Sequence, residues 1–430
     1  MSSSKSSGDV VITGIGVISP IGTSLETFWS SIEAGRCGFR RSELLSSVGS
    51  PDNIGGEVSD FTEESAKKEH LKSVRKQIKV MCREIQLGVA SALSALKDAG
   101  LGPGAIPPER IGVEFGANLM SSPPEQLLDA VVASSEGGTF QYDHWGVRDG
   151  RRFPGMEPLW LLKYLPNMPG CHIGIAIDAR GPNNSLVQDE ASGLLAIAEA
   201  VNAIRRGRAD VMVTGTTGTK LTAVKTPQHD HWDVLADGPA EERCRPLDKN
   251  RRGEVMAEAA CSLILESRAH AEARGAKIYG SILGTGASCC LDSQLGEQPA
   301  IELACRNALR QAGISVAELG HINACASGNP VRDSYEARAF RSLLGDAHVP
   351  VTAPKSYLGS AGSGSSLTEI AVSLLGLQHG VIPKTLNFES SDEDASLNVV
   401  SGEHLPTDNR VFLKTSVTRM GQCGAVVIGV

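Results

Sequence analysis

The chain has 430 residues, of which 41% are hydrophobic and 21% are charged, and its formal net charge is −8. This is the composition of a soluble globular protein, long enough for two core units or one large duplicated unit. An aromatic content of only 4% and the absence of long basic runs argue against a nucleic-acid-binding protein, although acidic carrier proteins can dock on small basic patches.

Apolar strands and amphipathic helices alternate in the first part of the chain. Residues 1–9 are polar and rich in serine, which predicts a disordered tail rather than a signal peptide. The apolar pattern predicts strands at 10–18 and 111–117, and helices at 23–34 and 78–99. Residues 118–170 are irregular and rich in Pro, Gly and Ser, so we expect an insertion that carries substrate or partner contacts.

Glu190 falls at a strand–turn–helix junction. Residues 185–187 end a short strand, 188–190 form a turn, and 191–204 have the apolar face of a helix that leads into a strand at 210–216. This order places Glu190 at or next to the N-terminus of a buried helix.

The second part of the chain repeats the same alternation. We expect strands at 257–266, 278–286, 321–324, 411–415 and 425–430, and helices at 267–274, 301–312 and 367–380. Two halves rich in strands and helices, 10–270 and 271–430, therefore predict a duplicated, layered α/β fold.

Ten cysteines are present, without a CxxC pair or the spacing of a disulfide framework. Reduced thiols in a cytoplasmic protein are the expected state. No apolar run is long enough to span a membrane. His229-Asp230-His231 lacks further ligands nearby in sequence, so we interpret it as a solvated loop and expect no metal and no other cofactor.

Seven blocks of sequence, in order, resemble the β-ketoacyl synthase II branch of the thiolase-fold superfamily. They are VVITGIGVISPIG at 10–22, GPNNSLVQDEASG at 181–193, RADVMVTG at 208–215, RPLDKNRRGEVMAEAA at 245–260, ARGAKIYGSILGTG at 273–286, INACASGNP at 322–330 and PKSYLGSAGSG at 354–364. The likeness runs from about residue 10 to the end. It implies a thiolase fold, in which duplicated βα halves form a layered αβαβα core.

The resemblance also implies a chemistry. Members of that family condense an acyl chain with malonyl-carrier protein. A cysteine at a buried helix N-terminus takes the acyl group as a thioester, and two histidines assist decarboxylation of the malonyl unit. A lysine and a glutamate support the histidines.

The three reactive positions of the family are changed in this chain. Glu190 stands at the nucleophile position, Cys325 at the first histidine position and Ser360 at the second. An acyl-glutamate would be an anhydride that reacts readily with water, so the condensing role is lost. We interpret Cys325 as a small, buried, inert thiol rather than a replacement nucleophile, and Ser360 as a residue that fills space.

Other family positions are kept or altered. The supporting Lys355 remains, as does the acidic residue Glu258. Because Lys355 is close to the nucleophile in the family, we expect a Glu190–Lys355 ion pair, which requires a separation within about 4 Å. Arg419 replaces the family's gating phenylalanine, which puts a gate of the family type in doubt.

Three functions fit these residues, and the sequence leaves open whether the chain is an enzyme. The first is a non-condensing subunit similar to the chain-length factors of polyketide and fatty acid biosynthesis. The second is an enzyme that processes acyl- or malonyl-carrier protein with altered chemistry, as an acyltransferase, hydrolase or decarboxylase. The third is a scaffold that binds acyl-carrier protein.

The resemblance implies two kinds of partner. One is acyl-carrier protein. The other is a second ketosynthase-like chain, in a homodimer or in a heterodimer with an active paralogue. From the family we expect the strand near 210–216 to pair across the two-fold axis.

Overall fold

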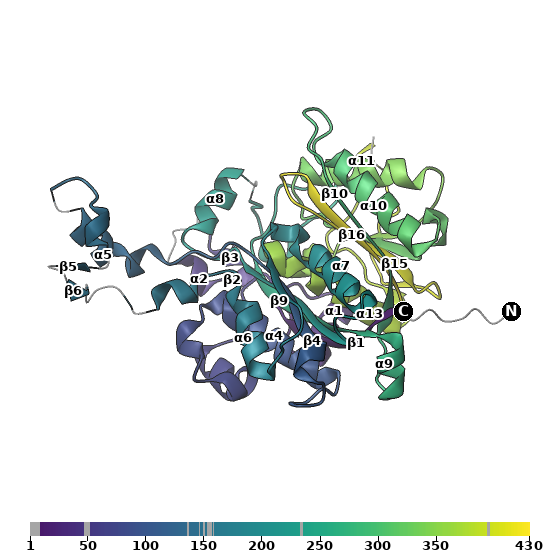
Figure 1. Cartoon of the computed structure of the whole chain (residues 1–430). Coiled ribbons are helices and arrows are strands. Elements are labelled where there is room, and N and C mark those ends of the chain that lie inside the picture. The colour runs from purple at the N-terminus through teal and green to yellow at the C-terminus, as the bar shows by residue number, and fades with distance from the viewer. Residues whose placement is uncertain are drawn as a thin grey trace.

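The computed structural model describes residues 9–46, 52–135, 137–145, 147–148, 151–152, 157, 159–232, 235–393 and 396–430. A mixed sheet of ten strands runs through the molecule (Figure 1), in the order β12-β11-β15-β16-β10-β1-β9-β8-β4-β7. Its strands are β1 (Val10–Ile18), β4 (Ile111–Ala117), β7 (Asn183–Leu186), β8 (Val211–Thr219), β9 (Glu258–Ser267), β10 (Gly280–Cys289), β11 (His321–Asn323), β12 (Val351–Thr352), β15 (Val411–Val417) and β16 (Gln422–Gly429).

The sheet consists of two equivalent halves. The first half runs β1-β9-β8-β4-β7 and the second runs β10-β16-β15-β11-β12. In each half the first two pairings are antiparallel and the last two are parallel. The halves meet where β1 pairs with β10 over a short stretch. The identical pairing pattern confirms the predicted duplication.

Helices form layers on and between the two half-sheets. Helices α7 (Ser192–Arg205) and α13 (Ser365–Gln378) contact strands of both halves and form the middle layer. Helices α4 (Arg83–Asp98) and α6 (Met168–Ile177) cover the first half, and α10 (Gln298–Ala312) covers the second with α11 (Arg332–Leu344) packed on it. Because α13 is enclosed, residues 365–377 are all buried. This is the expected αβαβα arrangement of the thiolase fold.

Shorter elements lie outside these layers. They are α1 (Leu25–Glu33), α2 (Glu43–Ser46), α3 (Glu63–Ser65), α5 (Leu128–Ser134), α8 (Lys225–Trp232), α9 (Arg268–Ala273) and α12 (Lys355–Leu358), with strand pairs β2 (Arg40–Arg41) and β3 (Ile54–Gly55), β5 (Val147–Arg148) and β6 (Arg151–Arg152), and β13 (Val381–Ile382) and β14 (Leu405–Pro406). In Figure 1, α5, β5 and β6 project far from the body. They belong to the predicted insertion, whose contact role stays a prediction.

Two expectations about elements were wrong. The helix predicted from residue 78 begins at Arg83, because 78–80 form a 3₁₀ turn and Cys82 is extended. His229 lies in α8 rather than in a loop, and the side chains of Asp230 and His231 lie outside the described residues. The sequence pattern also did not predict α6 and α11.

The expected role of the strand near 210–216 is also corrected. This strand is β8, and β4 and β9 hydrogen-bond to its two edges within the same chain. Only a strand at the end of the sheet offers unpaired backbone groups to another chain. In the first half that strand is β7, where Asn183 and Asn184 are exposed. The all-buried pattern of β8 is typical of a central strand, and the polar pattern of β7 is typical of an edge strand.

Candidate functional site

The site forms where β7 turns into α7. β7 runs parallel to β4 and ends at Leu186. A 3₁₀ turn at Asp189–Ala191 follows, and α7 begins at Ser192. Glu190 lies in this turn and is only 3% exposed. The structure therefore confirms the prediction that Glu190 lies at the N-terminus of a buried helix.

Hydrogen bonds from the second half of the chain fix the backbone of this turn. Ser363 Oγ donates to the carbonyl of Asp189 at 2.9 Å, and Ser416 Oγ donates to the carbonyl of Glu190 at 2.7 Å. Gly193 allows α7 to approach α13 closely, because a Cβ at this position would lie 2.2 Å from Ser366 Oγ. Both halves of the fold therefore position Glu190.

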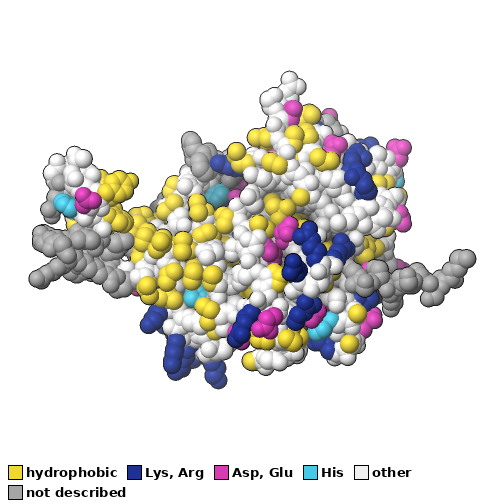
Figure 2. Space-filling view, in the orientation of Figure 1, with side chains coloured by type: hydrophobic (Ala, Val, Ile, Leu, Met, Phe, Trp, Pro, Cys, Tyr) yellow, Lys and Arg dark blue, Asp and Glu magenta, His cyan; other side chains and the backbone are white. Residues whose placement is uncertain are grey.

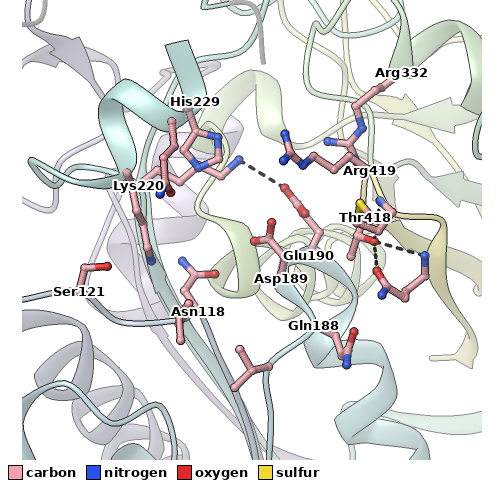
Figure 3. Close-up of a pocket in the computed structure, with 16 residues that line it drawn as sticks. Asn118, Ser121, Gln188, Asp189, Glu190, Lys220, His229, Arg332, Thr418 and Arg419 are labelled. Atoms are coloured by element: carbon pink, nitrogen blue, oxygen red, sulfur yellow. Dashed lines mark hydrogen bonds and ion pairs between the residues drawn. The ribbon is translucent and has the colours of Figure 1, made fainter. Parts of the chain in front are cut away.

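Lys220, not Lys355, is the ion-pair partner of Glu190. Lys220 follows β8 directly, and its Nζ lies 3.3 Å from Glu190 Oε1, as Figure 3 shows. The same ammonium lies 3.3 Å from Glu254 Oε2 and donates to Ser360 Oγ at 2.9 Å. These four side chains are nearly inaccessible to water. The expected Glu190–Lys355 ion pair is absent within 4.0 Å and is corrected.

Lys355 belongs to a second buried charge cluster. Its Nζ lies 2.7 Å from Glu369 Oε1 and donates to the carbonyl of Cys325 at 2.8 Å. The other oxygen of Glu369 pairs with Lys414, which also donates to the carbonyl of Ala324. With its ammonium engaged in this way, Lys355 is unavailable for a direct pair with Glu190.

The prediction that Glu258 supports the site is wrong. Its carboxylate pairs with Arg83 at 2.6 Å and accepts a hydrogen bond from the N–H of Val58. The carboxylate that holds Lys355 is Glu369, which α13 carries into the core between the half-sheets. Glu258 therefore ties the start of β9 to α4 and to the segment before it.

Opposing influences set the charge of Glu190. Burial raises the pKa of a carboxyl group, but the positive charges of Lys220, Arg332 and Lys355 and the backbone hydrogen bonding outweigh burial. The pKa of Glu190 consequently lies well below its usual value. Glu190 is an anion at neutral pH, and an ionised, ion-paired carboxylate does not act as an acyl carrier.

The surroundings of Cys325 do not activate its thiol. Burial raises the pKa of Cys325, and Lys355, whose Nζ lies 3.5 Å from the sulfur, opposes that effect only in part. A thiol that stays protonated is a weak nucleophile. The structure thus agrees with the interpretation of Cys325 as a buried, inert thiol.

Two spaces of very different size adjoin Glu190. The larger, about 330 Å³, opens on one side of the carboxylate and is lined mainly by polar and charged side chains, including Asp189, Lys220, Arg332 and Arg419 (Figure 3). The smaller, about 20 Å³, lies against Cys325, Lys355 and Ser360. Arg419 therefore lies at the cavity, as expected of a gate position, but its action as a gate remains a prediction.

The sequence correctly predicts that Glu190, Cys325 and Ser360 lie close together. It does not predict that Lys220, Arg332 and Glu369 also belong to the site. Lys220 could have been suspected, because a lysine directly after a buried strand lies at the same sheet edge as residue 190. Arg332 begins α11, where Asn329 Oδ1 accepts hydrogen bonds from the N–H groups of 331 and 332. Asparagine before a helix is a recognisable cap signal. No sequence pattern marks Glu369 as a site residue, except that it is a charged residue in an otherwise apolar helix.

The described residues contain neither a cluster of potential metal ligands nor a helix that could span a membrane. No cluster of three or more His, Cys, Asp or Glu side chains is arranged there to hold a metal ion. Across the same residues, every helix is too short or too polar to cross a membrane.

Known proteins share this fold over nearly the whole chain. Residues 7–271 match the β-ketoacyl synthase N-terminal domain, and residues 279–389 match its C-terminal domain. The chain therefore belongs to the β-ketoacyl synthase family.

Individual relatives cover both fatty acid and polyketide systems. The chain is 31% identical to 3-oxoacyl-[acyl-carrier-protein] synthase 2 of Coxiella burnetii, over 92% of each chain. It is 33% identical to the tetracenomycin polyketide synthase ketoacyl synthase alpha subunit of Streptomyces glaucescens, over 91% of this chain and 90% of the relative. A solved structure of the ishigamide ketosynthase/chain length factor aligns with a TM-score of 0.83 and 26% identity, over 98% of both chains.

Proposed function

We propose that this chain is a non-condensing subunit of fatty acid or polyketide biosynthesis, similar in role to a chain-length factor. One observation carries the proposal: an ionised Glu190, paired with Lys220, occupies the helix N-terminus that needs a thiol in a condensing enzyme. Neither Cys325 nor Ser360 supplies the imidazole that the family uses at those positions. The retained fold and cavity fit a subunit that shapes a ligand space without forming the acyl bond.

The alternative of an enzyme with altered chemistry is less well supported. An acyltransferase or hydrolase would need a nucleophile at Cys325 or Ser360, and a decarboxylase would need the imidazoles that these two positions lack. Burial raises the pKa of Cys325, and Ser360 accepts a hydrogen bond from the Lys220 ammonium, which has two carboxylate partners. A cation held by two carboxylates is a poor general base.

The partner that we propose is a cysteine-bearing chain of the same fold. Among the described residues, β7 is the edge strand of the first half of the sheet, and its polar residues 183 and 184 suit strand addition. Exposed apolar side chains lie nearby in sequence at Ile175 and Val187, which are 66% and 38% exposed. An edge strand with apolar neighbours suits pairing with the equivalent edge of a second chain.

The test is a product assay by mass spectrometry. The chain is incubated with acyl- and malonyl-carrier protein, alone and with a cysteine-bearing homologue co-expressed from the same source. We expect no acylated protein and no condensed product from the chain alone. With the homologue we expect a stable complex whose products differ in length from those of the homologue alone. Condensed product from the isolated chain would refute the proposal.

A basic patch is the docking surface that we propose for acyl-carrier protein. Lys72, Arg75, Lys76 and Lys79 are exposed within eight residues, and none has an ion-pair partner in the part of the chain that the structure describes. Basic side chains gather at the lower left in Figure 2, where the segment before α4 lies. Along the chain, the patch is followed by Arg83, which lines a second cavity of about 390 Å³. An acidic carrier protein is attracted to such a patch.

Charge reversal tests this surface. The Arg75→Glu/Lys76→Glu variant should bind acyl-carrier protein about tenfold or more weakly at low salt, because like charges then face each other. A matched control is Arg206→Glu/Arg208→Glu, which changes the same number of exposed charges at the far end of α7. Surface plasmon resonance at two salt concentrations measures both. Equal weakening by both variants would point to net charge rather than to the patch.

A further inference from the structure

Among the described residues, two line both of the spaces beside Glu190. The 330 Å³ cavity and the 20 Å³ chamber have Glu190 and Arg332 in common, and every other lining residue belongs to one or the other. Lys220 lines only the cavity, whereas Ser360 and Cys325 line only the chamber. The boundary between the spaces therefore runs through the Glu190 carboxylate.

Hydrogen bonds and ion pairs close this boundary from both sides. On one side, Lys220 Nζ bridges Glu190 Oε1 at 3.3 Å and Ser360 Oγ at 2.9 Å. On the other side, Arg332 Nη2 donates to the carbonyl of Val417 at 2.8 Å. Lys220 and Ser360 are each only 1% exposed.

The chamber behind the boundary is too small for a ligand. A volume of about 20 Å³ leaves room for a single water molecule. Cys325 Sγ lies in this chamber, 3.5 Å from Lys355 Nζ and 3.8 Å from Ser416 Oγ. A reagent or an acyl thioester that passes from the larger cavity into this chamber must cross the boundary at Glu190 and Arg332, which line both spaces.

We propose that Glu190 and Lys220 form a fixed partition that ends the ligand cavity and screens the Cys325 thiol from its contents. Glu190 then has a role beyond the loss of the nucleophile, because its size and charge keep a ligand away from the remaining sulfur. Lys220 is a positioning residue that holds the carboxylate across the passage. The partition belongs to the chain itself and does not depend on a partner or on the non-condensing role.

Glu190→Ala is the variant that opens the passage with the least disturbance. It removes the carboxylate at the boundary, while Lys220 keeps its ion pair with Glu254 and its hydrogen bond with Ser360. Glu190→Gln keeps the size of the side chain and should keep the passage closed. Lys225→Ala is the matched control, because Lys225 also lines the larger cavity but contacts Glu84 and the carbonyl of Thr219.

The experiment is alkylation of the full-length folded chain with iodoacetamide, followed by peptide mass spectrometry of each cysteine. Cys289 and Cys290 are exposed and provide the reference rate, and the fully buried Cys261 reports on general loosening. We expect Cys325 to react about tenfold or more faster in Glu190→Ala than in the unaltered chain, because access controls thiol reactivity. Glu190→Gln and Lys225→Ala should leave Cys325 protected, and Cys261 should stay protected throughout.

Three results would overturn the partition. The first is rapid alkylation of Cys325 in the unaltered chain, at the rate of Cys289. The second is unchanged protection of Cys325 in Glu190→Ala. The third is parallel labelling of Cys261 and Cys325 in that variant, which would show general unfolding instead of a local passage. None of these readouts involves carrier protein or a partner, so they stand apart from the test of the proposed function.

Discussion

A Glu190→Cys variant is expected to remain unable to condense acyl chains, although it restores the thiol that the family uses. The new thiol would lie near Lys220, which now sits 3.3 Å from the carboxylate, and a nearby ammonium favours the thiolate. The variant should therefore be alkylated readily at residue 190. Condensation needs decarboxylation of the malonyl unit as well, and Cys325 and Ser360 offer no imidazole for that step.

The size of the expected defect follows from the missing groups. A positioned acid or base contributes roughly 10²–10⁴-fold to a rate, so the absence of two imidazoles leaves condensation at least about 10⁴-fold below a complete site. The assay compares product from acyl- and malonyl-carrier protein with that of a cysteine-bearing family member at equal concentration. Glu190→Ser is the control, which should show neither alkylation at residue 190 nor product. Condensation by Glu190→Cys near the rate of the family member would show that the histidine positions are dispensable in this chain.

The family resemblance located the altered positions, and the order of elements along the chain predicted the junction at which Glu190 lies. Glu190 follows the short strand β7 and precedes α7, and Cys325 lies just after β11. Such junctions are set by short-range patterns that the sequence displays directly. The strand boundaries agree with the structure to within a few residues for the same reason.

The ion-pair partners could not be predicted in this way. A buried ammonium pairs with whichever carboxylate the packing brings within a few ångströms. Lys220 and Glu190 are thirty residues apart, and Lys355 and Glu369 are brought together by α12 and α13. The family resemblance predicted that Lys355 and Glu258 support the site. In the structure, β9 places the Glu258 carboxylate against Arg83 instead. The position of β8 between β4 and β9 is a long-range outcome of the same kind, and the predicted pairing of this strand with another chain was also wrong.

The need to balance buried charges explains how the lysine and glutamate side chains of this site are arranged. Each buried cation of the site has at least one carboxylate within 4.0 Å: Lys220 has two, and Lys355 and Lys414 share Glu369. Uncompensated buried charges are costly, so the carboxylates must stay ionised. In agreement, the pKa of Glu369 lies below its usual value, because Lys355 and Lys414 outweigh the effect of burial. Paired charges therefore hold the core of this site together, and Glu190 adds a further carboxylate to them at the nucleophile position.

Glu369→Gln should accordingly destabilise the protein by about 3–5 kcal/mol, because it leaves two buried ammonium groups without a counter-ion. That is a large share of the roughly 5–15 kcal/mol that keeps a typical domain folded. Chemical denaturation at pH 7 measures the loss as a lower midpoint. The control is Glu63→Gln. It breaks an ion pair between Lys67 and a Glu63 side chain that is 90% exposed, so it should leave the denaturation midpoint nearly unchanged.

The pH dependence of the stability difference between the unaltered chain and Glu369→Gln tests whether loss of the ionised carboxylate causes it. A carboxyl group whose pKa is lowered by folding stabilises the protein above its unfolded-state pKa, and that contribution is lost as pH falls through the folded-state pKa. The gap between the unaltered chain and Glu369→Gln should therefore be full at pH 7 and shrink at strongly acidic pH. Removing one ammonium together with the carboxylate, in Glu369→Gln/Lys414→Met, should recover part of the loss. A Glu369→Gln protein as stable as the unaltered chain at pH 7 would mean that Lys355 and Lys414 do not depend on this carboxylate for their charge balance.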